Sequence, residues 1–164
     1  MWQRIWRNLF SSWFQLARWF PKKKMREIRD YIAQGELKHA GELCFAIEAR
    51  YSLWSILNGI TPRLRAEQIF SSLRIWDTQD NCGVLVYLQL AERKIEIVAD
   101  RGLAKHVPES MWQALCQAFS IDMHEKTPYQ AVIACLEQIN SLLIEFYPAT
   151  EHDINELPNE PVIL

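Results

Sequence analysis

Five side chains with oxygen ligands could together bind a divalent cation. They lie in three separate segments of the sequence: Glu42, Asp77, Asp80, Asn81 and Asp100. Ca²⁺ takes about six to eight oxygen ligands and Mg²⁺ also binds carboxylates, so water would complete the shell of either ion. The spacing D-x-D-x-D-G of a calcium-binding loop does not occur in the sequence. The alternative is that Asp77 and Asp80 cap turns and that Arg101 neutralises the acids.

A hairpin is expected to bring these side chains together. Residues 84–88 are a continuous apolar run, and residues 94–99 follow after a short polar turn, so the two segments are predicted to be antiparallel strands. With a tight turn near Glu92 and Arg93, Gly83 would lie opposite Gly102. The loop that enters the first strand would then lie beside the segment that leaves the second.

Glu42 is expected at the same end of the sheet, because it begins a further predicted strand over residues 41–49. Arg101 and His106 follow the hairpin and would complete a polar rim there. His106 is as well explained as a solvated loop histidine, and the two glycines of the rim as residues that permit tight backbone angles.

The other elements are predicted from apolar spacing. Helices are expected over residues 24–37, 61–76, 108–121 and 127–147, the second opened by Thr61 as N-cap with Pro62 in its first turn. A strand–helix–strand unit makes its two strands parallel, and the hairpin adds an antiparallel neighbour. The fold class predicted is therefore α/β, a three-layer α/β/α sandwich with a small mixed sheet and an additional N-terminal amphipathic helix.

The 164 residues divide into a basic arm (1–23), one α/β/α domain (24–147) and an acidic, Pro-containing tail (148–164). Residues 1–26 hold seven Lys and Arg and no acid, whereas the remaining 138 hold eleven Lys and Arg and all twenty Asp and Glu, for a net charge of −2. On a helix, one face of the arm is aromatic and apolar and the other is basic. The residues expected to contact a membrane or partner are Trp2, Arg4, Trp6, Arg7, Leu9, Trp13, Phe20, Lys22, Lys23 and Lys24.

Three interpretations of the arm stay open. A helix in the plane of an anionic membrane surface fits the basic face, the aromatic face and the lysine cluster. Packing on its own domain or on a partner protein fits the apolar face equally well. A cleaved signal is disfavoured by the interspersed arginines, and nucleic acid is disfavoured because the acidic body would repel phosphate.

Two segments resemble the TPM-domain family. They are Asn81-Cys82-Gly83-Val84-Leu85-Val86-Tyr87-Leu88 and Glu92-Arg93-Lys94-Ile95-Glu96-Ile97-Val98-Ala99-Asp100-Arg101-Gly102-Leu103. This family includes thylakoid-lumen proteins of photosystem II repair and secreted bacterial homologues. The match is closest to a short bacterial branch without a signal peptide, whose genes often neighbour a LemA-type membrane protein.

The resemblance implies an α/β/α sandwich, calcium binding at the rim in some members, and a phosphatase activity attributed to the plant proteins. This chain has Asp100-Arg101-Gly102-Leu103-Ala104 where many members have a Gly-aromatic-Gly-Leu-Glu run, so Ala104 lacks an acid and Arg101 adds a cation. It also has neither the secretory signal nor the anchoring tail of the exported members. Both departures weaken the inference that this chain shares the metal binding and the phosphatase activity of other family members.

The sequence therefore predicts a TPM-like binding or accessory module at the inner face of a membrane, without established catalysis. The four cysteines form no C-x-x-C pair, which is typical of reduced thiols in the cytoplasm. Expected partners are a membrane surface or a LemA-type membrane protein, and no nucleic acid. No cofactor is required, although Ca²⁺ or Mg²⁺ would suit the rim. The alternative function is a divalent-metal-dependent acid phosphatase that uses the rim acids.

Overall fold

A computed structural model describes residues 2–10, 13–149 and 155–164. Its centre is a four-stranded sheet in the order β3-β2-β1-β4, with β1 parallel to β2 and β4, and β3 antiparallel to β2. The strands are β1 (Glu42–Glu48), β2 (Gly83–Gln89), β3 (Lys94–Ala99) and β4 (Val162–Ile163). The described helices are α1 (Trp2–Phe10), α2 (Trp13–Trp19), α3 (Lys22–Glu36), α4 (Leu53–Leu57), α5 (Pro62–Ser72), α6 (Glu109–Glu125), α7 (Pro128–Phe146) and the short 3₁₀ helix η1 (Leu103–Lys105).

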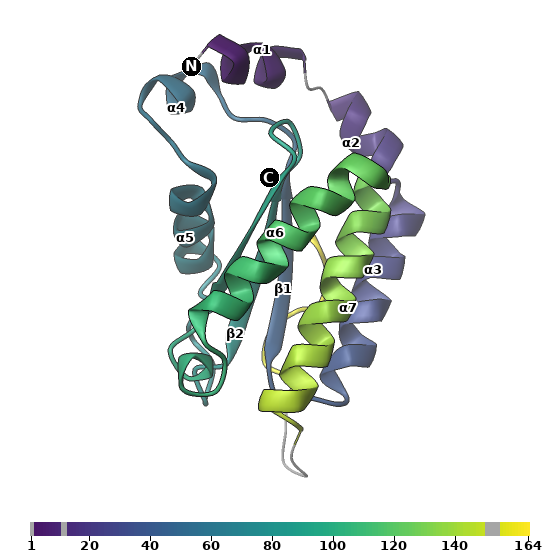
Figure 1. Cartoon of the computed structure of the whole chain (residues 1–164), viewed down its shortest axis with the longest axis vertical. Coiled ribbons are helices and arrows are strands. Elements are labelled where there is room, and N and C mark those ends of the chain that lie inside the picture. The colour runs from purple at the N-terminus through teal and green to yellow at the C-terminus, as the bar shows by residue number, and fades with distance from the viewer. Residues whose placement is uncertain (1, 11–12, 150–154) are drawn as a thin grey trace.

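Helices cover both faces of the sheet, as the sequence predicts (Figure 1). Along β1, Leu43, Phe45 and Ile47 belong to the apolar cluster that contains α3, α6 and α7, whereas Cys44 and Ala46 belong to the cluster around α5. Every residue of β1 and β2 is buried, which accounts for the nearly unbroken apolar sequence of both strands. The α/β/α class is therefore confirmed.

The helix α5 makes the crossover between the parallel strands. Thr61 accepts a hydrogen bond from the backbone N–H of Leu64 and Pro62 occupies the first turn, as expected of an N-cap. The helix ends at Ser72, four residues before its predicted end, and Arg74 then turns the chain with a φ of 55°.

The β2–β3 hairpin exists, but its predicted register is wrong by two residues. Val84 pairs with Ala99, and the carbonyl of Gly83 accepts from the N–H of Asp100 rather than facing Gly102. The reason is the turn: Gln89 pairs with Lys94, and the N–H of Arg93 bonds to the carbonyl of Leu90, so the turn is centred one residue earlier than expected.

The basic arm contains two helices on either side of residues 11 and 12, which lie outside the described residues. In α2, Leu16 is buried in the same apolar cluster as α3, and so is Phe20 immediately after it. The tail also packs on the body: Pro148 bridges to His39, and β4 pairs with β1. The arm, for which packing on its own domain was one of the open interpretations, thus contributes to the core, and the tail contributes to the sheet.

Candidate functional site

The rim expected from the sequence is present at the start of β1 and β2. Glu42 pairs with Gly83 in the parallel register, so both lie at this end of the sheet. The N–H of Gly102 donates to the carbonyl of Asn81 at 3.0 Å, and Arg101 Nε donates to Asn81 Oδ1 at 3.0 Å. A Cβ at Gly102 would overlap the backbone carbonyls of Asp80 and Asn81, so a larger residue would push the two segments apart.

Several oxygen atoms of the rim already accept hydrogen bonds from other groups. Glu42 Oε2 accepts from the N–H of Leu157 in the tail at 3.0 Å, and Asp77 Oδ2 pairs with Arg74 at 2.6 Å. Asp100 Oδ1 accepts from the N–H of Arg101, while Asp100 Oδ2 is buried without a hydrogen-bond partner. His106 is exposed and its ring lies 5.4 Å from that of Tyr147.

Two side chains of the rim bear on cation binding. Asp100 Oδ2 is a suitable oxygen ligand, whereas Asn81 Oδ1 already accepts a hydrogen bond from Arg101. In the part of the chain that the structure describes, no group of three or more His, Cys, Asp or Glu side chains could hold a metal ion.

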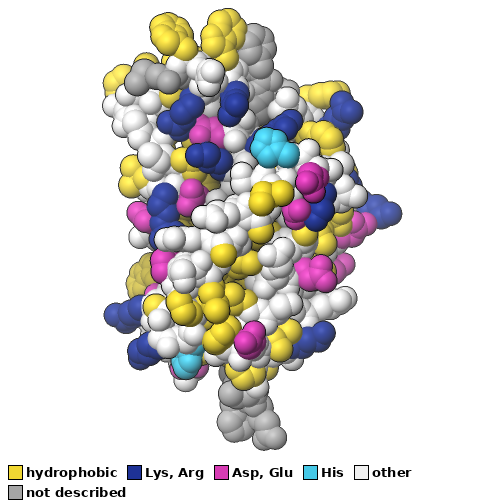
Figure 2. Space-filling model, in the orientation of Figure 1, with side chains coloured by type: hydrophobic (Ala, Val, Ile, Leu, Met, Phe, Trp, Pro, Cys, Tyr) yellow, Lys and Arg dark blue, Asp and Glu magenta, His cyan; other side chains and the backbone are white. Residues whose placement is uncertain are grey.

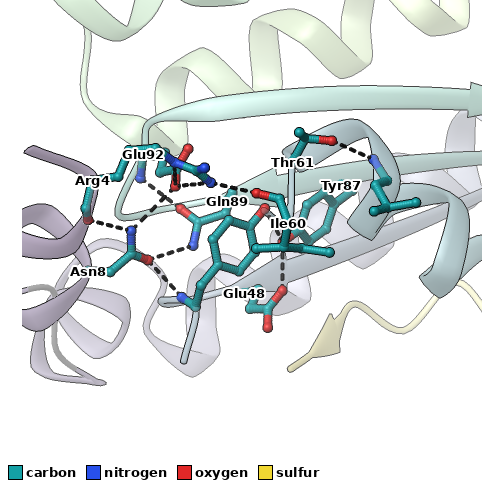
Figure 3. Close-up of polar contacts among 10 residues, drawn as sticks. Arg4, Asn8, Glu48, Ile60, Thr61, Tyr87, Gln89 and Glu92 are labelled. Atoms are coloured by element: carbon teal, nitrogen blue, oxygen red, sulfur yellow. Dashed lines mark hydrogen bonds and ion pairs between the residues drawn. The ribbon is translucent and has the colours of Figure 1, made fainter. Parts of the chain in front are cut away.

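A second polar site, which the sequence did not indicate, fastens α1 to the opposite end of the sheet (Figure 3). Arg4 Nε donates to Glu92 Oε1 at 2.8 Å, and Arg4 Nη2 donates to the carbonyl of Ile60 at 2.8 Å. Glu92 is buried in the β2–β3 turn, so this ion pair is partly shielded from water. We call the contacts of Arg4 and Asn8 with the body the α1 clasp.

Asn8 is the centre of the α1 clasp and is only 2% exposed. Its Oδ1 accepts from the N–H of Tyr51 at 2.7 Å and from Gln89 Nε2 at 3.4 Å, while its Nδ2 donates to the carbonyl of Arg4 and to Glu92. Helical spacing places Asn8 on the polar face of the arm, together with Arg4 and Arg7. A polar residue that caps buried backbone groups gives no signal in apolar spacing, which is why it was missed.

Next to the α1 clasp, Glu48 at the end of β1 joins three elements. It accepts from Arg65 Nε at 2.9 Å and from the hydroxyl of Tyr87 at 2.6 Å, and Tyr87 lies 3.2 Å from the hydroxyl of Tyr51. Burial raises the pKa of Tyr87 and of Tyr51 well above the ordinary tyrosine value. Hydrogen bonding to Glu48 raises the pKa of Arg65, so its charge is fixed. The cluster thus holds an ion pair that joins β1 to α5.

The α1 clasp leaves two described apolar side chains of α1, Trp2 and Trp6, facing outward. Trp2 is 77% exposed and Trp6 56%, and the neighbouring helix α4 carries Trp54, which is 75% exposed, together with Leu53 and Leu57. We call these five residues the aromatic tip. The hydrophobic side chains along the upper edge of the molecule over α1 and α4 are visible in Figure 2. Phe14 of α2 is also exposed, at 75%.

The other arm residues differ in their surroundings. The side chains of Leu9 and Trp13 lie outside the described residues, and Phe20 is in the core. Of the lysine cluster, Lys24 lies over the ring of Tyr129 at 4.6 Å, Lys23 is 3.9 Å from Glu27, and Lys22 is exposed. Across residues 2–10, 13–149 and 155–164, no helix combines the length and the apolar character needed to span a bilayer.

The helix α4 lies between the predicted strand over 41–49 and the predicted helix over 61–76, where no helix is predicted from the sequence. Its signal is present in retrospect: Ser52 accepts from the N–H of Ser55 as an N-cap and precedes an apolar pair, Leu53 and Trp54. Five residues are too few for helical periodicity to be recognised.

Comparisons with known proteins agree with this architecture. The solved structures include a similar one, the NMR structure of the BA42 protein from the psychrophilic bacterium Bizionia argentinensis, with a TM-score of 0.75 and 23% identity over 87% of this chain and 93% of that one. No curated protein matches the chain. The sequence model of the TPM domain matches residues 15–142, which include the hairpin, the rim and the greater part of α7. Because this match covers well over half of the sequence, the chain belongs to the TPM domain family.

Proposed function

We propose that this TPM domain is a non-enzymatic binding module that rests on an anionic membrane surface through its aromatic tip. The observation that carries the proposal is the α1 clasp: Arg4 and Asn8 fix the polar side of α1 to the body, which turns Trp2 and Trp6 away from it. A cluster of exposed apolar side chains on a folded domain is typical of a surface that binds a membrane or a partner protein.

The chemistry of the aromatic tip favours lipid as that environment. Tryptophan prefers the headgroup region of a bilayer, because its ring is apolar and carries one polar N–H. The exposed basic side chains of the arm, among them Arg7, Arg18 and Lys22, would be attracted to anionic headgroups. Two helices from distant parts of the sequence supply the tip, so its shape is held by the fold and does not depend on binding.

The membrane side that fits this proposal is the inner, cytoplasmic face. The four cysteines, Cys44, Cys82, Cys116 and Cys135, are free thiols, and three of them are buried. A LemA-type membrane protein is the alternative occupant of the aromatic tip, and the experiment below treats it as an opposing outcome.

Co-sedimentation with vesicles tests the proposal on the full chain. The double variant Trp2→Ser/Trp6→Ser should bind phosphatidylglycerol vesicles about tenfold or more weakly than the native chain, because each Trp loses apolar burial. Trp76→Ser is the matched control, since Trp76 is an exposed tryptophan that follows α5 near the start of β2, at the opposite end of the sheet. Equal loss in both variants, or no loss in the double variant, would contradict the proposal.

A truncated chain is a poor substitute for these variants, because Leu16 and Phe20 belong to the core. If vesicles bind nothing and a membrane protein instead co-purifies in a Trp2- and Trp6-dependent way, the tip is a protein-docking surface and the lipid proposal is wrong.

A divalent-metal-dependent phosphatase is the second candidate function, and the buried, unpartnered Asp100 Oδ2 is the observation that favours it. Calorimetric titration with Ca²⁺ and Mg²⁺ would show heat of binding in the native chain that Asp100→Asn abolishes. Hydrolysis of p-nitrophenyl phosphate that survives Asp100→Asn and Asp80→Ala would exclude the rim as its site.

A further inference from the structure

A cavity of about 560 Å³ lies below the aromatic tip, between the arm, the β2–β3 turn and the end of α6. It is separate from the rim, because the β2–β3 turn lies at the other end of both strands. Figure 2 shows several Lys and Arg side chains and a histidine gathered on the upper part of this face. The polar residues that line the cavity are Arg7, Gln15, Glu92, Arg93, Lys94, Ser120 and His124.

The charge of this cavity is strongly unbalanced. Arg7, Arg93 and Lys94 come from three different elements and are all exposed, and among the described residues none of them forms an ion pair. Glu92 is the one acid among the described lining residues, and Arg4 of the α1 clasp already neutralises it at 2.8 Å. Three cations therefore border one cavity without a counter-charge from its lining.

The uncharged polar side chains of the cavity also suit an anionic ligand. The hydroxyl of Ser120 and the imidazole of His124 lie one helical turn apart at the end of α6 and border the cavity. Arginine side chains present a planar fork of N–H groups that matches the oxygens of phosphate, and hydroxyl and imidazole groups can add further hydrogen bonds to them.

We infer that this cavity binds a phosphate-bearing anion through Arg7, Arg93 and Lys94, with Ser120 and His124 as additional donors. The proposed function suggests the phosphate of a lipid headgroup as the source, because Arg7 shares α1 with Trp2 and Trp6. That choice of source rests on the proposed function, whereas the anion site itself does not.

Two-dimensional NMR of the full chain tests the site with three probes: inorganic phosphate, dihexanoyl phosphatidylglycerol below its micelle concentration, and phosphatidylglycerol vesicles. The first two should shift the amide signals of Ser120 and His124 in the native chain. The variant Arg7→Gln/Arg93→Gln should lose these shifts and bind vesicles about thirtyfold more weakly, since each cation near an anionic surface contributes about fivefold.

The matched control is Lys38→Gln/Lys105→Gln, which removes the same charge from exposed positions at the rim end of the molecule. In this control variant the phosphate-induced shifts of Ser120 and His124 should persist. Its affinity for vesicles should fall by less than about threefold, because distant exposed charges are screened by salt. If the phosphate-induced shifts and the vesicle affinity fell equally in the two double variants, the effect would be one of net charge, and the proposed anion site would be wrong.

The outcomes separate the two proposals. If neither soluble probe shifts Ser120 or His124, the anion site is wrong even if vesicles still bind. If inorganic phosphate gives the shifts and Trp2→Ser/Trp6→Ser leaves vesicle binding unchanged, the site stands with free phosphate as its ligand and the membrane proposal fails.

Discussion

Glu48 is the residue on which the polar contacts between β1, β2 and α5 converge. Arg65 and Tyr87 both donate to its carboxylate, and Tyr87 belongs to the apolar cluster around α5 whereas Arg65 is partly exposed. Removing Glu48 would take the carboxylate partner from both Arg65 and Tyr87, which costs more than losing a hydrogen bond at an exposed site. The cluster therefore fixes how α5 sits on the sheet.

Residue-scale chemistry also predicts how stability changes at alkaline pH. Burial raises the pKa of Tyr87 and raises that of Cys44 to about 11 from its ordinary 9.0. The unfolded chain loses these protons first, so stability is full below the unfolded pKa values and falls as the pH rises through and above them.

Urea unfolding followed between neutral pH and about pH 11 should therefore show the free energy of unfolding falling above about pH 9, by up to about 1.4 kcal/mol per pH unit and group. The variant Cys44→Ala should show a shallower fall. A free energy of unfolding that stays level over this range would contradict the burial of these groups.

Also at the scale of residues, the positions of the rim residues were easier to predict from the sequence than the groups to which they are hydrogen-bonded. Asn81 lies against Arg101 and Gly102 because strand pairing is a backbone property that apolar spacing indicates, although the register differs from the predicted one by two residues. The bonds of Glu42 to the tail and of Asp77 to Arg74 depend on side-chain positions, which that spacing does not specify.

At the scale of elements, α1 is held in an unusual way for an amphipathic helix. Its buried contacts are made largely by Arg4 and Asn8, while most of its described apolar side chains are exposed and Ile5 is half-buried. Hydrophobic periodicity predicts that a helix has two faces, but it does not say which face the rest of the chain will cover. In this structure the polar face is covered, because Glu92 binds Arg4 and the backbone N–H of Tyr51 binds Asn8.

The substitution Asn8→Leu tests this element. It removes the acceptor of the Tyr51 N–H and the bonds to Gln89 and Glu92, which should cost about 1–3 kcal/mol and loosen α1. Hydrogen exchange should accelerate at the amides of α1 while those of β1 and β2 keep their protection. Gln3→Leu is the control, since Gln3 is exposed on the same helix; similar acceleration in both variants would contradict the role given to Asn8.

At the scale of the whole molecule, the proposed contacts are all at one end and the rim is at the other. The parallel strands run from the rim toward the aromatic tip, so β1 begins at Glu42 beside the acids and ends at Glu48 beside the α1 clasp. The α/β/α layers were predictable because each strand and long helix has its own spacing. The positions of the arm and tail were not, because both depend on surfaces that exist only after the core has formed.

The strand β4 has a consequence for how the chain is made. It covers the free edge of β1, with the N–H of Leu164 bonded to the carbonyl of Ile47, yet it follows β1 only after the hairpin and both long helices. An uncovered strand edge can pair with other chains. During synthesis on the ribosome, one edge of β1 therefore stays open until β4 has emerged, and association between neighbouring nascent chains is most favoured in that interval.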